Sequence, residues 1–157
     1  MEIMETMPVE EHRDRVILVG LHANRLKAEE NADEWSMDEL AALTETAGGE
    51  PVARVLQNKE APDPRTFIGE GKVEEIRALI ENEHAEMVIF DNDLSPSQMR
   101  VLTDAFGVQV LDRSGLILDI FAKRAKTKEG RLQVELAQYQ YLLPRLTGMW
   151  THLVRQT

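Results

Sequence analysis

Apolar residues along the first two-thirds of the chain fall into short runs separated by longer amphipathic stretches. Each run has the length of a strand, and its nearly continuous apolar character is typical of a strand covered on both faces, as in a parallel sheet. The four runs occupy residues 15–21, 51–56, 86–91 and 108–111. We therefore predict four strands in a mostly parallel sheet.

The stretches between these runs predict helices. Residues 36–39 (SMDE) and 95–98 (SPSQ) have the form of capping boxes, in which two side chains three positions apart satisfy the first free amides of a helix. A third helix follows Gly71 and has one apolar face between residues 73 and 80. Strands that alternate with helices predict right-handed crossovers. The fold class we expect is α/β, a small four-stranded sheet flanked by helices and followed by a long helical arm.

The periodicity becomes purely helical in the last part of the chain. Seven apolar residues alternate at spacings of four and three, which is the a/d repeat of a helix whose apolar seam lies against another helix. Pro144 removes a backbone hydrogen bond and Gly148 weakens the helix, so we expect a kink or a frayed end beyond Leu143. The seam residues are Leu132, Leu136, Tyr139, Leu143, Leu146, Trp150 and Leu153.

The charge of the chain changes sign at nearly the same place. Residues 112–157 carry eight basic and four acidic residues, a net charge of +4, in a chain whose net charge is −10. Affinity for phosphate depends on local positive potential rather than on net charge. A nucleic-acid partner is therefore compatible with this chain despite its acidic net charge. We expect a flexible tail at 1–14, an α/β subdomain at 15–112 and a basic helical arm at 113–157.

Composition narrows the class of protein further. With 43% apolar and 29% charged residues, the 157-residue chain is globular and long enough to bury a core. It has no cysteine, which excludes disulfides and thiolate metal sites and is compatible with the cytosol. No apolar run approaches the roughly 20 residues of a membrane span. We expect a cytoplasmic protein without a membrane partner. We also expect no metal, since the histidines are dispersed along the sequence. They are His12, His22, His84 and His152.

One loop raises the question of a phosphate site. Gly69, Gly71 and Lys72 stand at a predicted helix start, where backbone amides and the helix dipole favour anions. The spacing of a P-loop is absent, because Thr66 stands five positions before Gly71 and Val73 follows the lysine. A Gly-lined turn with an exposed lysine is the simpler interpretation.

A second candidate is the acidic end of the third strand. Asp91, Asn92 and Asp93 lie where open α/β sheets tend to place sites, and two carboxylates could hold Mg²⁺. Asn and Asp are also common turn formers, which favours a structural role. We find no nucleophile–base pair and predict no catalytic residue. A small nucleotide-binding domain that uses Lys72 with Asp91 or Asp93 remains the alternative function.

Three stretches carry a resemblance to a known family. They read TFIGEGKVEEI at 66–76, VIFDNDLSPSQMR at 88–100 and, without a gap, DRSGLILDIFAKRAKTKEGRLQVELAQYQYLLPRLTGMWTHLVRQ at 112–156. On these residues the chain is similar to the N-terminal region of the HflX family of GTP-binding proteins. The first 65 residues fit the same fold and carry little of the signature.

The resemblance implies an architecture and a function. Members of the family have an α/β subdomain and an antiparallel pair of long helices ahead of a GTPase domain. They bind the large (50S) ribosomal subunit and act as translational GTPases that split or rescue stalled ribosomes. In the family, the second helix and the GTPase domain would follow the position of Gln156. We therefore expect this chain to hold half of the helical hairpin, to need no GTP or Mg²⁺ and not to be an enzyme.

The resemblance also brings the arm close to ribosomal RNA near the peptidyl-transferase region. Basic side chains there would contact phosphates, and aromatic or guanidinium groups could stack on unpaired bases. Trp150 lies on the seam, so packing in the core is an equally good interpretation for it. The cations could simply form a solvated face. Arg113 could instead cap or pair within the α/β unit. The candidates are Lys123, Arg124, Lys126, Lys128, Arg131, Arg145, Thr147, Gly148, Met149, Trp150, His152 and Arg155.

Two further partners follow from the same features. A seam that lacks its second helix is an apolar surface large enough to mark an interaction site. We expect it to pair with a second copy of the chain or to fold back on the sheet. A third hypothesis, compatible with ribosome binding, is that this region restrains the GTPase domain of the same protein.

Overall fold

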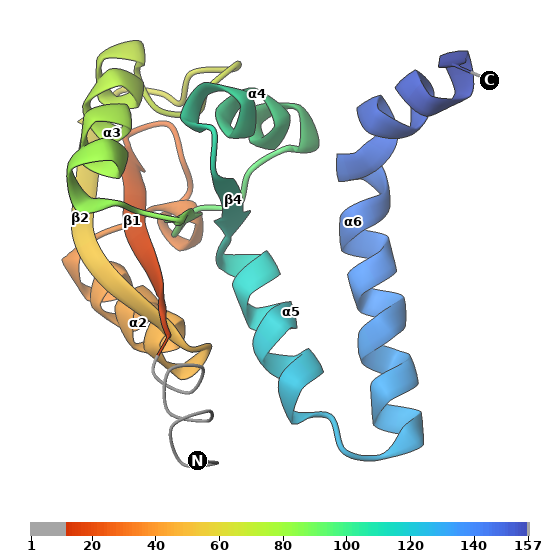
Figure 1. The fold of residues 1–157 in the computed structure, drawn as a ribbon. Coiled ribbons are helices and arrows are strands. Elements are labelled where there is room, and N and C mark those ends of the chain that lie inside the picture. The colour runs from red at the N-terminus through yellow and green to blue at the C-terminus, as the bar shows by residue number, and fades with distance from the viewer. Residues whose placement is uncertain (1–11, 157) are drawn as a thin grey trace, which may run out of the picture.

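Four parallel strands form one sheet in the computed structural model, which describes residues 12–156 of the chain (Figure 1). The strands are β1 (Asp14–Ala23), β2 (Gly49–Lys59), β3 (Met87–Phe90) and β4 (Gln109–Asp112). Their order across the sheet is β2-β1-β3-β4, and every neighbouring pair is parallel. The predicted α/β fold class and all four predicted strands are confirmed.

Helices cover both faces of this sheet. They are α2 (Glu34–Thr46), α3 (Glu70–Glu83), α4 (Pro96–Phe106) and α5 (Arg113–Arg124), with a short 3₁₀ helix, η1 (Ala28–Glu30), after β1. The connection after β1 leads to β2, at one edge of the sheet. The connections after β2 lead to β3 and β4, on the opposite side of β1. The carboxyl ends of β1 and β3 therefore border the crevice where the winding direction changes.

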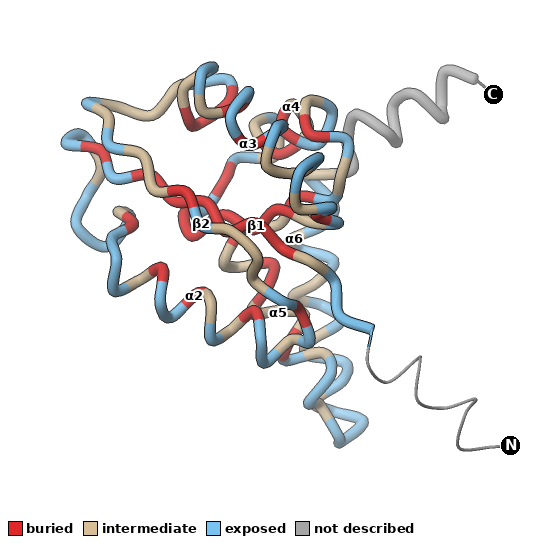
Figure 2. The backbone as a smooth tube through the Cα atoms, turned by 60° about the vertical axis from the view of Figure 1, so that its left-hand side comes forward, coloured by how far each residue is buried: buried red, intermediate tan, exposed pale blue. Residues whose placement is uncertain are grey.

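The central strand β1 divides the core in two because successive side chains point to opposite faces. Val16 and Leu18 pack with the apolar residues of α2 and α5, whereas Ile17 and Val19 pack with those of α3 and α4. Figure 2 shows the buried residues concentrated along this strand and on the inner sides of the helices. Burial on both faces explains why the strand sequence shows a continuous apolar run.

Helix starts agree with the sequence in one case and differ in another. Ser95 caps α4 as predicted: its hydroxyl accepts the N–H of Gln98 at 3.1 Å, and the Gln98 side chain accepts the N–H of Ser95 at 2.9 Å. The predicted cap at Ser36 is wrong, since the cap of α2 is Asp33, three residues earlier, and the helix begins at Glu34. Asp33 accepts the N–H of Ser36 at 2.7 Å, and Ser36 completes the box as its third residue. Glu39 is therefore not part of the cap and can make a contact elsewhere.

The arm consists of two helices. Helix α5 follows β4 directly, and α6 (Lys128–Gln156) runs back beside it after the turn at residues 125–127 (Figure 1). Pro144 lies inside α6, and Figure 1 shows the last turns of this helix at an angle to the turns before them. Most of the predicted tail, residues 1–11, lies outside the described residues. No helix among the described residues combines the length and the apolar character needed to cross a bilayer.

Candidate nucleic-acid interface

The turn between α5 and α6 concentrates positive charge at one end of the arm. Five cations fall within residues 123–131, and all five side chains are exposed. Glu129 is the acidic residue in this stretch, which contrasts with the strongly acidic α/β body. We call this cluster the basic turn. Its members are Lys123, Arg124, Lys126, Lys128 and Arg131.

Local hydrogen bonds build the turn. The N–H of Ala125 donates to the carbonyl of Phe121 at 2.9 Å, and extended backbone at Ala125 then ends α5. The Thr127 hydroxyl accepts the N–H of Gly130 at 2.9 Å and so caps the start of α6. No proline marks this turn, so the sequence pattern does not predict that the arm divides into two helices here.

Helix electrostatics explain only some of these cations. Lys123 and Arg124 lie in the last turn of α5, where the helix dipole favours positive charge. Lys123 also donates to the carbonyl of Ala47 at 2.9 Å and pairs with Asp119 at 3.1 Å. Lys128 opens α6, at the end of a helix where a cation is unfavourable. The helix dipole therefore does not account for a cation at Lys128.

Asp112 connects the arm to the body. Its side chain is fully buried, and it accepts the N–H of Gly115 at 3.0 Å, the N–H of Leu94 at 3.1 Å and the hydroxyl of Tyr141 at 2.6 Å. The first bond caps α5, the second holds the connection between β3 and α4, and the third holds α6. One carboxylate therefore joins three elements.

Arg145 completes this junction. Its guanidinium lies 3.7 Å from the centroid of the Tyr141 ring and 3.7 Å from Asp112 Oδ2, and it donates to the carbonyl of Leu94 at 3.2 Å. Burial raises the pKa of Tyr141, and the hydrogen bond and charge of Asp112 raise it further. With 16% of its side chain exposed, Arg145 is engaged inside the chain. Of the predicted RNA contacts whose side chains are described, it is the one that is not exposed.

The apolar seam lies on a different face of α6. Leu132, Leu136, Tyr139 and Leu143 are 57–63% exposed. The described part of the seam is therefore not folded against the sheet, which rules out one of the two expected ways of covering it. Pairing with a second copy stays a prediction.

The remaining candidates of the arm lie near its C-terminal end. Their backbone belongs to α6, and their side chains lie outside the described part of the structure. They are Thr147, Gly148, Met149, Trp150, His152 and Arg155. The seam residues Leu146 and Leu153 are outside the described side chains as well.

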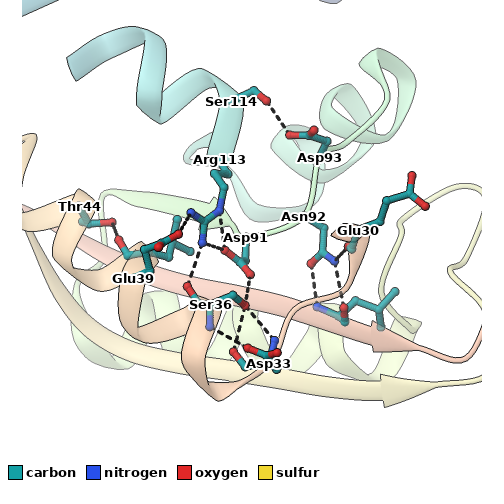
Figure 3. Close-up of polar contacts among 12 residues, drawn as sticks. Glu30, Asp33, Ser36, Glu39, Thr44, Asp91, Asn92, Asp93, Arg113 and Ser114 are labelled. Carbon is teal, nitrogen blue, oxygen red and sulfur yellow. Dashed lines mark hydrogen bonds and ion pairs between the residues drawn. The ribbon is translucent and has the colours of Figure 1, made fainter. Parts of the chain in front are cut away.

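The acidic end of β3 is a polar cluster that holds the fold together (Figure 3). Asp91 accepts the Ser36 hydroxyl at 2.6 Å and Arg113 Nε at 2.9 Å, and Arg113 also pairs with Glu39 at 2.6 Å. Burial disfavours the charged guanidinium, but the hydrogen bonds and charges of Asp91 and Glu39 outweigh it and raise the pKa of Arg113. The expectation that Arg113 pairs within the α/β unit is confirmed.

The neighbours of Asp91 are similarly engaged. Asn92 donates to the carbonyls of Leu21 and Glu30 at 2.9 Å, and Asp93 accepts the Ser114 hydroxyl at 2.8 Å. These residues border a 410 Å³ cavity at the carboxyl ends of β1 and β3. Because all three side chains hydrogen-bond to other groups of the protein, the contacts favour the structural interpretation of this stretch over a Mg²⁺ site.

The predicted phosphate loop is also occupied by the protein itself. The N–H of Gly69 donates to Gln57 Oε1 at 3.0 Å, and Lys72 pairs with Glu75 at 3.0 Å. Gly71 lies in the first turn of α3 with open space around it. These contacts favour a structural turn and give the nucleotide-binding alternative no additional support.

One histidine meets carboxylates at the start of β1. His12 Nε2 lies 3.4 Å from Asp14 Oδ1 and 3.7 Å from Glu86 Oε2. The sequence did not bring these residues together, because Glu86 is far from His12 along the chain. The His12 side chain is 65% exposed, so these contacts lie at the surface of the molecule.

Comparison with known proteins decides the family. Residues 34–122 match the family described as GTP-binding GTPase N-terminal, and residues 124–157 match the GTP-binding GTPase Middle Region. The chain belongs to the HflX family of GTP-binding proteins. Its division into two matched regions falls at the end of α5, next to the basic turn. The resemblance inferred from the sequence is thereby confirmed.

Individual HflX relatives support this assignment. The chain is 49% identical to the GTPase HflX of Flavobacterium psychrophilum, over 91% of this chain and 34% of the relative. It is 46% identical to the GTPase HflX of Escherichia coli K12, over 91% of this chain and 32% of the relative. The chain thus spans about a third of the length of these curated relatives, in their N-terminal and middle regions.

A solved structure shares the fold. The crystal structure of a GTP-binding protein from the archaeon Sulfolobus solfataricus, in complex with GDP, superimposes with a TM-score of 0.63 at 24% identity. The match covers 88% of this chain and 40% of that protein. At this identity the likeness concerns the arrangement of the sheet and helices.

Proposed function

We propose that this HflX region binds the large ribosomal subunit through its arm, as part of a cytoplasmic GTPase that splits or rescues stalled ribosomes. The observation that carries the proposal is the basic turn. Five exposed cations gather at one end of the arm while residues 1–111 carry a net charge of −14. Local positive potential of this kind favours a polyphosphate such as ribosomal RNA.

The division of roles within the arm supports the same proposal. Lys126 and Lys128 have exposed side chains, and the position of Lys128 opposes the dipole of α6. The proposed RNA contacts near the end of the arm, from Thr147 to Arg155, would supply stacking and hydrogen bonding. Arg145 would support them by holding α6 in place.

Co-sedimentation with purified 50S subunits tests the proposal. We expect the chain to pellet with the subunits at low salt. Changing Arg124 and Lys126 to glutamate should weaken this binding at least tenfold, because several phosphate contacts would be replaced by repulsion. The free chain should keep its fold, since both side chains are exposed.

A charge-matched control separates local from overall charge. Arg25 and Arg77 are exposed cations of the α/β body, with 75% and 54% of their side chains accessible. Changing both to glutamate alters the net charge by the same amount as the change in the basic turn. Equal loss of binding in the two double variants would show that only overall charge matters and would contradict the proposal.

A further inference from the structure

Helix α6 is attached to the body without a buried side chain in its described part. Between residues 128 and 145, every side chain is exposed or only partly buried. A helix that packs on a core normally buries an apolar stripe. Here the exposed seam leaves that stripe in solvent, so another kind of contact must position the helix.

The polar contacts that attach α6 to β4, α4 and their connections lie within a little over one turn, where the partly buried Tyr141 ring also packs against the core. The Tyr141 hydroxyl donates to Asp112 at 2.6 Å, and Arg145 donates to the carbonyl of Leu94 at 3.2 Å. Arg100 of α4 donates to the carbonyl of Pro144 at 3.3 Å. Hydrogen bonds to charged groups are the strong ones, so this small cluster can hold the helix.

We propose that Asp112, Tyr141 and Arg145 form a latch that sets the position of the arm, and that α6 swings about the turn at residues 125–127 when the latch opens. We call these three residues the Asp112 latch. The inference concerns the mechanics of the arm and does not depend on RNA binding.

The surroundings of Asp112 explain how the latch opens without unfolding the body. When Tyr141 leaves, the carboxylate still accepts the N–H groups of Gly115 and Leu94. The cap of α5 and the connection after β3 therefore persist, and water replaces the phenol. The described part of α6 buries no residue fully, and the partly buried Tyr141 ring is the apolar group of the latch that leaves the core.

Distance measurements between two labels test the latch directly. The chain contains no cysteine, so Asp104→Cys on α4 and Gln140→Cys on α6, both exposed positions, give one defined pair of spin labels. We expect one narrow distance distribution in the otherwise unchanged chain. Tyr141→Phe should add a longer, broader population, because the bond to Asp112 is lost.

Tyr139→Phe provides the matched control. Tyr139 is on the same helix, 62% exposed on the seam, and its substitution should leave the distribution narrow. Amide hydrogen exchange supplies a second readout: in Tyr141→Phe the amides of α6 should exchange about tenfold faster or more, while those of α2 and α3 keep their rates. Unchanged distances and rates in Tyr141→Phe would overturn the latch. Faster exchange throughout the body would also overturn it, by making Tyr141 a part of the core.

Discussion

Tyr141 occupies the space that a side chain on Gly115 would need. A β-carbon at position 115 would lie 2.6 Å from the Tyr141 hydroxyl oxygen and 3.0 Å from the ring carbon that bears it. The hydroxyl cannot withdraw without losing its bond to Asp112. The docking of α6 thus depends on the absence of a side chain in the first turn of α5.

Gly115→Ala should lower the free energy of unfolding by about 1–3 kcal/mol, the usual effect of forcing extra volume into a tight contact. Urea denaturation measures it. Gly71→Ala is the control, because a β-carbon at Gly71, in the first turn of α3, meets no atom within 4 Å. There we expect no loss and a gain of up to about 1 kcal/mol from helix propensity. The same change in both variants would argue against the close packing of Tyr141 on Gly115.

Arg113→Gln should destabilise the α/β body by about 3 kcal/mol, near the lower end for breaking a buried ion pair, because Arg113 remains partly exposed. The substitution leaves the Asp91 carboxylate, 3% exposed, without its cation. Chemical denaturation at neutral pH gives the difference. Arg77→Gln removes an exposed pair with Glu74 and should change stability by less than about 1 kcal/mol. Equal effects would remove the structural role we assign to Arg113.

The loop around Asp63 should become less stable in acid. The N–H groups of Thr66 and Arg65 donate to the Asp63 carboxylate and hold its pKa below the ordinary value of 3.8. As the pH falls, the unfolded chain binds this proton before the folded chain does, so the contribution is present above about pH 4 and is lost below it.

Asp63→Ala tests this pH dependence. The variant should be less stable than the parent chain at pH 7, and the difference should shrink as the pH falls from 5 to 3. Thermal unfolding across this range measures both curves. A constant difference at every pH would show that the charge of Asp63 contributes nothing.

The seam should pair the chain with a second copy. Leu136 and Leu143 are about three-fifths exposed, and burying two such side chains in each copy favours association. Changing both to lysine should shift a dimer to a monomer in sedimentation equilibrium. Gln133→Lys and Gln140→Lys, on the same helix beside the seam, should preserve the dimer. A parent chain that stays monomeric at every concentration would contradict the pairing.

The strands were predictable because their apolar runs reflect burial on both faces, and the Ser95 cap because its partner is three residues away. The cap at Ser36 was misplaced because Asp33 offers an equally good oxygen with its own reciprocal partner. The sequence contains one sign of the latch. Tyr141 and Arg145 are four residues apart, which places them on one face of α6, away from the seam.

Their joint partner, Asp112, could not be identified in this way, since it meets them only after the chain turns at residues 125–127. That turn carries no proline and only one nearby glycine, Gly130. The pairing of Asp91 with Arg113 likewise depends on β3 and β4 being neighbours. Strand order decides such contacts, and local periodicity does not contain it.

The salt dependence of binding to 50S subunits tests the central claim most directly. If the basic turn contacts phosphates, the logarithm of the binding constant should fall steeply with the logarithm of salt concentration. Replacing Lys126 and Lys128 by glutamine should reduce the slope by about 0.7–0.9 for each phosphate contact removed. A slope that is unchanged in this variant, with binding intact, would contradict the account and return the basic turn to an ordinary solvated surface.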